Sequence, residues 1–366
     1  MAESSEHGKS PRILVRQESP FNAGPPPEEL RASFVTPNDL FFVRSHGGVP
    51  AVDPADFRLE IRGMVEHPLT LSLADLARYP RHEVTATIQC AGNRRSELAA
   101  LRPIPHELAW GSEAVSNARW AGIRLADLLQ DAAPTADARH AAFCGLDEAE
   151  RHGKRFHFGG SIPLEKALAG EVLLALEMNG EPLPPVHGYP LRVVVPGWIG
   201  ARSVKWLHKI KLQAGPSDNY FQSVAYRLFP ASVGPDNVVW DEGTMLGEQA
   251  INAVVTSPPP GAHLAAGSVH VEGFALAGGG RAVERVEISL DGGRSWRLAA
   301  LRSEQERWAW RFWECDVDLA SGAHEIVVRA WDSASQTQPE AVDQVWNFKG
   351  YMNNAWPRVP VVVREP

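Results

Sequence analysis

The segment Thr87–Ser96 (TIQCAGNRRS) places a cysteine, Cys90, at the end of an apolar run, with two arginines shortly after it. Guanidinium groups near a thiol favour its thiolate form, and a thiolate is a soft ligand for a transition metal. The other cysteines, Cys144 and Cys315, are distant in sequence, so neither a zinc site nor an iron–sulfur cluster is indicated. Cys90 is therefore a candidate metal ligand whose partners come from elsewhere, a candidate nucleophile, or a buried structural thiol.

Three further segments combine glycine, histidine and basic residues. They are Phe42–His46 (FVRSH), His187–Arg192 (HGYPLR) and Gly197–Trp206 (GWIGARSVKW). Backbone N–H groups at glycine turns, together with Arg and Lys side chains, suit a bound anion or phosphate. None of the three matches a phosphate-binding loop or a dinucleotide fingerprint. Taken singly, each histidine also fits a structural role and each arginine a solvated surface position.

Short strands and helices within residues 36–247 must hold these segments in place. Strands are predicted at Phe57–Arg62, Val84–Ile88 and Leu191–Val195. Ser72–Asp75 reads as a capping box for a short helix that ends by residue 80, and Ile123–Gln130 predicts a second helix. Residues 1–35 are polar and proline-rich, and we expect them to run extended over the surface.

The character of the sequence changes beyond residue 248. Ser257–Gly261 (SPPPG) is a sharp break, and Asp291–Gly293 is a hairpin signal. Strand-like runs recur at Val269–Phe274, Arg285–Leu290, Trp296–Leu301, Trp308–Cys315 and Glu325–Trp331. Several short strands with turn signals predict an antiparallel sandwich of immunoglobulin-like kind. The expected organisation is an extended segment at 1–35, an α+β domain at 36–247 and an all-β domain at 248–366.

Length and charge agree with this division and exclude some partners. A chain of 366 residues suggests about two domains. Its formal charge is −8, from 36 basic and 44 acidic residues, whereas a general nucleic-acid binder needs a basic surface. Met1–Pro20 carries no apolar stretch suited to secretion, and the longest apolar runs fall far short of the ~20 residues that cross a bilayer. We expect a cytoplasmic protein with no nucleic-acid or membrane partner.

Taken together, the motifs resemble the sulfite oxidase family of molybdopterin oxidoreductases. The resemblance runs from Pro20–Ala23 to Asn353–Trp356. It is carried by FVRSH at 42–46, CAGNRRSE at 90–97, ARWAG at 118–122, GLD at 145–147, GSIP at 160–163, EMNGEPLP at 177–184, HGYPLRVVVPGWIGARSVKW at 187–206, SLDGGRSW at 289–296 and WAWRFW at 308–313. It implies a molybdopterin domain followed by an immunoglobulin-like dimerisation domain, and hence a homodimer.

The resemblance also implies roles for individual residues. Cys90 would be the protein's thiolate ligand to one molybdenum per chain. The positions that match pterin- and phosphate-binding residues are Phe42, Val43, Arg44, Ser45, His46, Asp147, His187, Arg192, Ser203, Val204 and Lys205. The positions that match the oxyanion pocket are Arg44, Arg95, Trp110 and Tyr226. The implied reaction is oxidation of sulfite to sulfate by oxygen-atom transfer, with electrons passed to an outside acceptor such as a cytochrome or dioxygen.

The sequence departs from the family pattern in ways that bear on function. No segment has the length or pattern of the haem domain of animal sulfite oxidases, so we expect no haem and a likeness to the haem-free plant or bacterial type. Lys349 stands where the family has a pocket arginine, which keeps the charge but loses the bidentate fork. Tyr351–Asn354 (YMNN) is similar to the related nitrate reductases, although Tyr226 favours the sulfite side.

Two alternatives follow from these departures. The first is nitrate reduction, or oxidation of another sulfur oxyanion, on the same fold. The second is a non-catalytic relative that binds the pterin, or a partner through its sandwich domain. Retention of Cys90, Arg44 and Tyr226 argues against the second alternative, because a binding module has no need of a thiolate in a basic pocket. A molybdenum analysis distinguishes the two classes.

Overall fold

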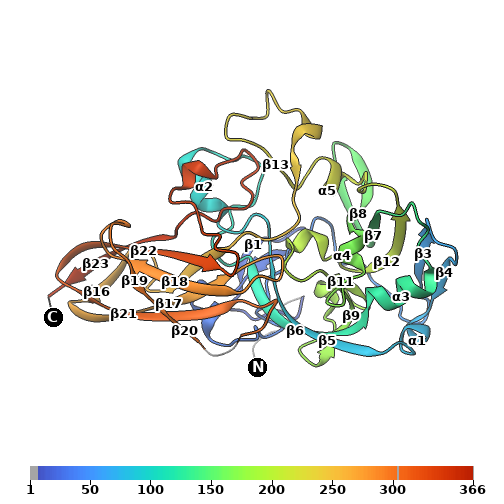
Figure 1. Ribbon diagram of the computed structural model, residues 1–366, viewed down its shortest axis with the longest axis horizontal. Coiled ribbons are helices and arrows are strands. Elements are labelled where there is room, and N and C mark those ends of the chain that lie inside the picture. Colours follow the sequence, from blue (N-terminus) through green and yellow to red (C-terminus); the bar gives the residue numbers. More distant parts are fainter. Residues whose placement is uncertain (1–6, 303–304, 366) are drawn as a thin grey trace.

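A computed structural model describes residues 7–302 and 305–365. Its strands gather into two groups at opposite ends of the long axis (Figure 1). One group belongs to the predicted α+β part and the other forms the predicted sandwich. The predicted fold class is therefore confirmed. Residues 1–6, 303–304 and 366, which fall within the predicted N-terminal segment and the predicted all-β domain, lie outside the described residues.

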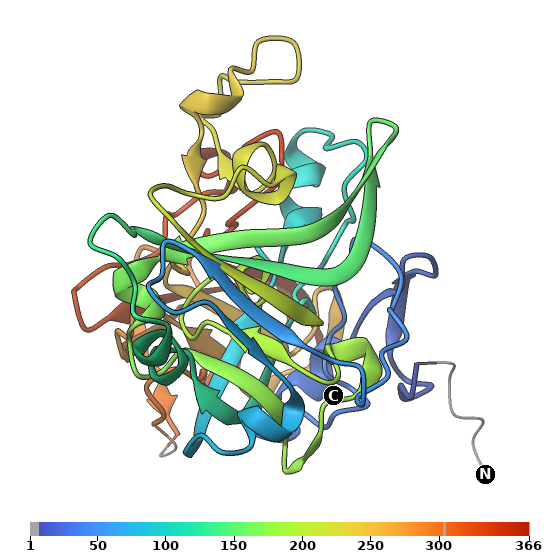
Figure 2. The same ribbon diagram turned by 90° about the vertical axis from the view of Figure 1, so that its right-hand side faces the viewer.

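Two five-stranded sheets form most of the α+β part. The first has the order β10-β9-β6-β5, with β11 paired to β9: β5 is Arg81–Gln89, β6 Val115–Arg124, β9 Leu173–Met178, β10 Glu181–Pro182 and β11 Arg192–Val194. The second has the order β4-β3-β12-β7-β8: β3 is Leu59–Gly63, β4 Leu69–Leu71, β7 His140–Arg151, β8 Lys154–Pro163 and β12 Leu207–Gln213. Figure 2 faces this end of the molecule, where the long β7–β8 hairpin is green. Each predicted strand in this part falls on a real one.

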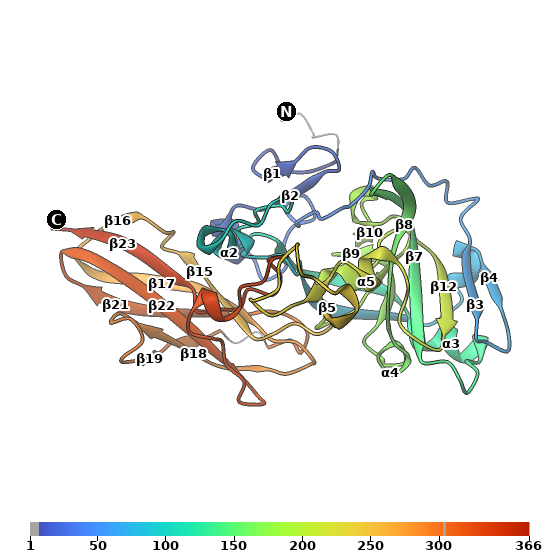
Figure 3. The same cartoon turned by 90° about the horizontal axis from the view of Figure 1, so that it is seen from above.

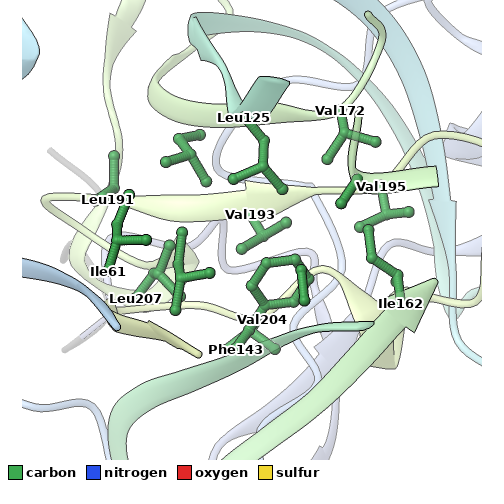
Figure 4. Close-up of a cluster of buried hydrophobic side chains, with 14 of the residues drawn as sticks. Ile61, Leu125, Phe143, Ile162, Val172, Leu191, Val193, Val195, Val204 and Leu207 are labelled. Atoms are coloured by element: carbon green, nitrogen blue, oxygen red, sulfur yellow. The ribbon is translucent and has the colours of Figure 1, made fainter. Parts of the chain in front are cut away.

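One hydrophobic core joins the two sheets. Figure 4 shows Ile61 of β3 and Phe143 of β7 beside Val193 of β11 and Leu125 of a short helix. All four side chains are at least 97% buried. Because residues from both sheets share this cluster, the loops at the strand ends are held at fixed positions. Those loops carry the motifs that the sequence singled out.

The helices are short. They are α1 (Leu73–Leu76), α2 (Arg95–Leu101), α3 (Leu125–Ala132), α4 (Leu164–Ala167) and α5 (Tyr220–Ser223), with 3-10 turns at Pro27–Arg31, Pro185–His187, Gly200–Arg202, Trp240–Glu242 and Val342–Gln344. The capping box is confirmed, since Ser72 N donates to Asp75 Oδ2 at 3.0 Å and Asp75 N to Ser72 Oγ at 3.2 Å. The helix predicted from Ile123 begins at Leu125, because β6 continues through Arg124. None of the helices in the described ranges has the length and apolarity needed to cross a bilayer.

The sandwich consists of two facing sheets around a separate core. One sheet has the order β15-β17-β21-β20: β15 is Asn252–Ser257, β17 Gly267–Leu276, β20 Ala300–Leu301 and β21 Arg311–Leu319. The other has the order β16-β23-β22-β18-β19: β16 is Ala262–Ala265, β18 Val283–Ser289, β19 Arg297–Leu298, β22 Gly322–Asp332 and β23 Arg358–Arg364. The run predicted as one strand at Trp296–Leu301 is split, with β19 in one sheet and β20 in the other.

The expectation that residues 1–35 merely run over the surface is wrong for much of the described segment. Strands β1 (Leu14–Gln17) and β2 (Asn22–Gly24) form a hairpin, drawn blue near the middle of the molecule's length in Figure 3. Ala23 is fully buried, and it exchanges backbone hydrogen bonds with Val43 at 3.1 and 2.7 Å. Ile13 and Phe21 pack in the same small core as Val43. The hairpin therefore supports the FVRSH segment directly.

Two very small strands complete the α+β part. They are β13 (Arg227–Leu228) and β14 (Thr244–Met245), which pair with each other. Leu246 N donates to Tyr226 O at 2.9 Å immediately beside this pair. Tyr226 adopts a φ of 55°, a left-handed conformation that costs a non-glycine residue energy. The small sheet thus holds the backbone of the predicted tyrosine in a conformation it would not adopt freely.

Candidate active site

Most of the predicted site residues converge on one pocket. Segments from Phe41 to Tyr226 in the sequence meet there. The predicted residues that line the pocket are Phe42, Arg44, Ser45, His46, Cys90, Asp147, His187, Arg192, Ser203, Lys205 and Tyr226. The side chains of Val43 and Val204 do not line it, because both are fully buried in hydrophobic cores.

Cys90 reaches the pocket from the end of β5. The strand stops at Gln89, and Cys90 N then donates to Ala114 O at 2.9 Å. Gly92 N donates to Cys90 Sγ at 3.4 Å, so the turn after the cysteine directs a backbone dipole at the sulfur. A Cβ atom on Gly92 would lie 2.3 Å from Arg95 Nη2, so a larger residue would displace this guanidinium. The close approach of the turn to Arg95 thus favours glycine at this position.

The two arginines of this motif have different surroundings. The Arg94 guanidinium binds Glu97 of α2 at 2.8 Å and Asn252 of the sandwich at 2.9 Å. Arg95 is 3% exposed and its Nε and Nη1 donate to backbone carbonyls, among them Leu108 O at 2.8 Å. The reading in which both guanidinium groups face the thiol is therefore corrected: the Arg94 guanidinium is bound to other partners, and Arg95 packs behind the turn.

A buried cationic cradle lies at one side of the pocket. Arg192 donates to His187 O and Ser203 O, both at 3.1 Å, and Lys205 donates to Ser45 Oγ at 2.7 Å. Burial lowers the pKa of Arg192 to about 9, and burial with the nearby Arg192 charge lowers the pKa of Lys205 to about 7. The hydrogen bonds of both cations go to carbonyl and hydroxyl oxygens rather than to a carboxylate, so the two side chains could hold a phosphate.

The pocket also contains the carboxyl group of Asp147. Its side chain is 96% buried, and its Oδ1 atom has no hydrogen-bond partner among the described residues. Burial raises the pKa of Asp147 to about 6, with the charge of Lys205 acting in the opposite direction. A buried acceptor without a hydrogen-bond donor lowers the stability of a folded protein. Its position indicates a ligand that brings an N–H or O–H group.

His46 and Tyr226 form the opposite wall. The Nδ1 atom of His46 faces Arg44 Nη2 at 3.2 Å and Arg151 Nη2 at 2.9 Å. Guanidinium groups donate only, so Nδ1 must be the unprotonated acceptor and Nε2 must carry the proton. Nε2 then donates to Tyr226 Oη, 2.7 Å away, which leaves the hydroxyl hydrogen of Tyr226 free to donate elsewhere.

The charge states of this pair follow from its burial. Burial, followed by the charges of Arg44 and Arg151, holds the pKa of His46 well below its usual range, so the imidazole is neutral near pH 7. Burial also raises the pKa of Tyr226 to about 12, so this phenol stays protonated. Tyr226 stacks on Tyr351 with ring centroids 5.3 Å apart. The wall is therefore a fixed hydrogen-bond donor rather than a base.

The remaining predicted residues lie outside this pocket. A second hollow, the vestibule, shares Arg44 and His46 with the pocket and contains Lys349. Arg95 and Trp110 line neither hollow. Trp110 is fully buried in the hydrophobic cluster that includes Cys90, and its Nε1 atom has no partner within the described part of the chain. The structure thus brings Arg44 and Tyr226 to the pocket and Lys349 to the vestibule.

Sequence reasoning missed three residues of the site. Arg151 comes from the tip of the β7–β8 hairpin and contacts His46. Glu107 pairs with Lys349 in the vestibule. Lys9 is 97% buried, and its Nζ lies 2.5 Å from His187 Nε2. No motif contains any of them, since each reaches the site through a contact between distant segments.

Comparisons with known proteins cover almost the whole chain. Residues 46–221 match the family described as oxidoreductase molybdopterin binding domain, and residues 244–364 match the Mo-co oxidoreductase dimerisation domain. The sulfite oxidase of Arabidopsis thaliana is 39% identical, with 97% of this chain and 95% of that protein covered. The mitochondrial sulfite oxidase of Homo sapiens is 43% identical, and the chain spans 66% of its length.

A solved structure agrees with these matches. The sulfane dehydrogenase SoxCD from Paracoccus pantotrophus superposes with a TM-score of 0.80 at 28% identity, covering 94% of this chain and 85% of that one. The similarity therefore extends over both the α+β part and the sandwich.

Proposed function

The chain belongs to the sulfite oxidase family of molybdopterin oxidoreductases, and on this basis we propose that it is a molybdenum enzyme that oxidises sulfite to sulfate. In that reaction sulfite gains one oxygen atom from water, while two protons and two electrons leave. An external acceptor, a cytochrome or dioxygen, takes the electrons. The single observation that carries the proposal is a pocket in which one thiol faces buried cations and a protonated tyrosine.

The residues of the pocket fit a molybdopterin. Cys90 Sγ offers a soft ligand to the metal, one per chain. Arg192 and Lys205, whose pKa values are depressed, would hold the phosphate. The unpartnered Oδ1 of Asp147 would accept a hydrogen bond from the pterin. When bound, the cofactor would supply the two-electron redox chemistry and the oxygen-atom transfer.

The protein's own groups would bind and orient the substrate. Arg44 lines both the pocket and the vestibule, so its charge draws an oxyanion inward. The hydroxyl hydrogen of Tyr226 would donate to a substrate oxygen, because His46 already occupies the tyrosine's acceptor side. The proton of Tyr226 stays in place at neutral pH, so its role is to orient the oxyanion.

Steady-state assays test the proposal. Molybdenum-loaded enzyme is given sulfite with ferricyanide, cytochrome c or dioxygen in turn, and nitrate with a reduced dye as electron donor. We expect sulfite oxidation, with the preferred acceptor identified by rate. Nitrate turnover without sulfite turnover would identify the protein as a nitrate reductase instead. A fully matured preparation without molybdenum would instead favour the non-catalytic alternative.

We further propose a cytoplasmic homodimer that assembles through the sandwich and contains no haem. The match of residues 244–364 to a dimerisation domain supports the dimer. A net charge of −8 supports the absence of a nucleic-acid partner. An absorption spectrum of the native protein, together with fractionation of the cells that make it, tests the haem and localisation proposals.

A further inference from the structure

A carboxylate sits among the cations at the entrance of the site. Glu107 Oε1 forms an ion pair with Lys349 Nζ, and Glu107 Oε2 lies 3.9 Å from Arg95 Nη2. The side chains of Glu107 and Lys349 are only 17% and 20% exposed. Both line the vestibule, which opens onto Arg44 and His46 of the inner pocket. The carboxylate therefore faces the hollow that adjoins the inner pocket.

Arg95, one of the two cations around Glu107, keeps little capacity for a second anion. Arg95 Nε donates to Lys349 O at 3.2 Å and to Gly350 O at 3.1 Å, and its Nη1 donates to Leu108 O at 2.8 Å. The remaining nitrogen, Nη2, faces Glu107. A carboxylate and a sulfur oxyanion present similar oxygen acceptors to such donors. Glu107 and an oxyanion thus compete for Lys349, while Arg95, which lines neither hollow, holds the carboxylate in place.

The arrangement also changes the field felt by the substrate. Without Glu107, the vestibule would present Arg44, Arg151 and Lys349 to an anion. With it, one positive charge is neutralised and a negative charge lies beside the path. The resulting penalty grows with the charge of the anion, so a doubly charged species such as sulfite or sulfate loses more than a singly charged one.

We propose that Glu107 is a specificity-determining residue that occupies Lys349 and Arg95 and thereby weakens the binding of dianions at the entrance. The inference rests on the proposed function, because it treats a sulfur oxyanion as the substrate. In the parent enzyme, Lys349 would line the vestibule while its charge is taken up by Glu107 and not by the substrate. Removing the carboxylate should release the lysine for the anion.

The test combines Glu107→Gln, Lys349→Met and the double variant in molybdenum-loaded enzyme. Two quantities are measured, the sulfite KM and the equilibrium Kd for sulfate by titration calorimetry. We expect Glu107→Gln to lower both about two- to fivefold, the size of a partly exposed charge interaction, with kcat little changed. Lys349→Met should weaken sulfate binding more in the Glu107→Gln background than in the parent, because only there is the lysine free.

Controls separate this inference from the proposed function. Glu60→Gln removes a carboxylate paired with Arg62 outside both hollows and should leave both constants unchanged. Glu107→Ser repeats the test should the glutamine variant fold poorly. An unchanged or weaker sulfate affinity in both Glu107 variants would overturn the inference, as would an equal effect of Lys349→Met in the two backgrounds. Sulfate binding is read without turnover, so a failure to oxidise sulfite counts against the proposed function alone.

Discussion

At the scale of single residues, the site depends on which atoms are already bound to something else. His46 accepts from two guanidinium groups and donates to Tyr226, so neither ring nitrogen remains for a proton transfer. Cys90 Sγ, in contrast, receives only a long hydrogen bond from Gly92 N among the contacts described. The tyrosine is therefore a fixed donor and the thiol is the group presented for ligation.

Cys90→Ser should abolish sulfite turnover and leave the fold intact. A serine oxygen is a harder and less basic donor than a thiolate, so the redox properties of the metal would be wrong. Turnover, molybdenum content and metal spectroscopy are measured together, and we expect retained pterin with an altered metal signal. Cys144→Ser, at a thiol outside the pocket, should retain activity. Near-normal turnover in Cys90→Ser would show that Cys90 is not the metal ligand.

The stability of the cofactor-free protein should fall as the pH drops below about 6.5. His46 and His187 are buried, and burial lowers the pKa of each well below the unfolded value of about 6.5. Below that value the unfolded chain binds protons that the folded chain refuses, so each histidine reduces the free energy of unfolding by up to about 1.4 kcal/mol per pH unit. Above it, both states are neutral and the effect vanishes.

Denaturant unfolding between pH 5 and pH 8 measures this dependence. In His46→Gln the amide can accept and donate as the neutral imidazole does, so the decline below pH 6.5 should be shallower. A decline of equal slope in the variant would show that His46 does not contribute to it.

At the scale of elements, the N-terminal segment supports residues that line the pocket. Lys9 lies five residues before β1 and donates to Asn38 O at 2.6 Å and Phe41 O at 2.8 Å. The same amine contacts His187, which lines the pocket. The backbone bonds between Ala23 and Val43 fix the other end of the segment. A stretch that composition alone describes as a linker therefore packs against His187 and the FVRSH segment.

Lys9→Met should weaken cofactor retention and lower the stability of the cofactor-free protein. The change removes the donor from the buried carbonyl of Phe41, at a cost of about 1–3 kcal/mol, and from the part-buried carbonyl of Asn38. Molybdenum content after dialysis and the Tm of the cofactor-free form are the measurements. Lys211→Met, at an exposed lysine on β12, is the matched control. Equal retention in the two variants would contradict a role for Lys9 at the site.

Strands were predictable where apolar and polar residues alternate regularly, and they were missed where many charged residues interrupt that alternation. The pattern of β3 and β18 is visible because polar and apolar residues alternate cleanly. The β7–β8 hairpin was not predicted, since its outer half is rich in charged residues that suggest a loop. In the same way, the motifs located the pocket, but the pairing of Lys349 with Glu107 depends on a contact across 242 residues.

At the scale of the whole molecule, the sandwich is joined to the site rather than appended to it. Thr87 of β5 donates its N–H to Trp308 O at 3.0 Å, and Trp310 N donates to Thr87 Oγ1 at 2.8 Å. Arg94 binds Asn252 of β15. These contacts lie within four residues of Cys90, so the strand and the turn that present the thiol are both fastened to the sandwich.

The purified protein should be a symmetric dimer. The outer face of the sheet that contains β19 and β23 exposes Leu298 and Val362, of which Leu298 is 67% exposed. Closed two-fold dimers are the commonest way to cover such surface. Light scattering at micromolar concentration measures the mass directly, and a monomer across that range would refute the expectation.

The contacts of Thr87 and Arg94 also limit how the protein can be engineered. A chimera that took its sandwich from a relative would replace Asn252, Trp308 and Trp310 together with the fold that carries them. The contacts at Trp308 and Trp310 use backbone groups and would persist in a related sandwich, whereas the Asn252 side-chain contact would be lost wherever the donor has another residue. Grafting is therefore expected to succeed when the donor sandwich keeps an asparagine at position 252, or when residues 87–97 are transplanted with it.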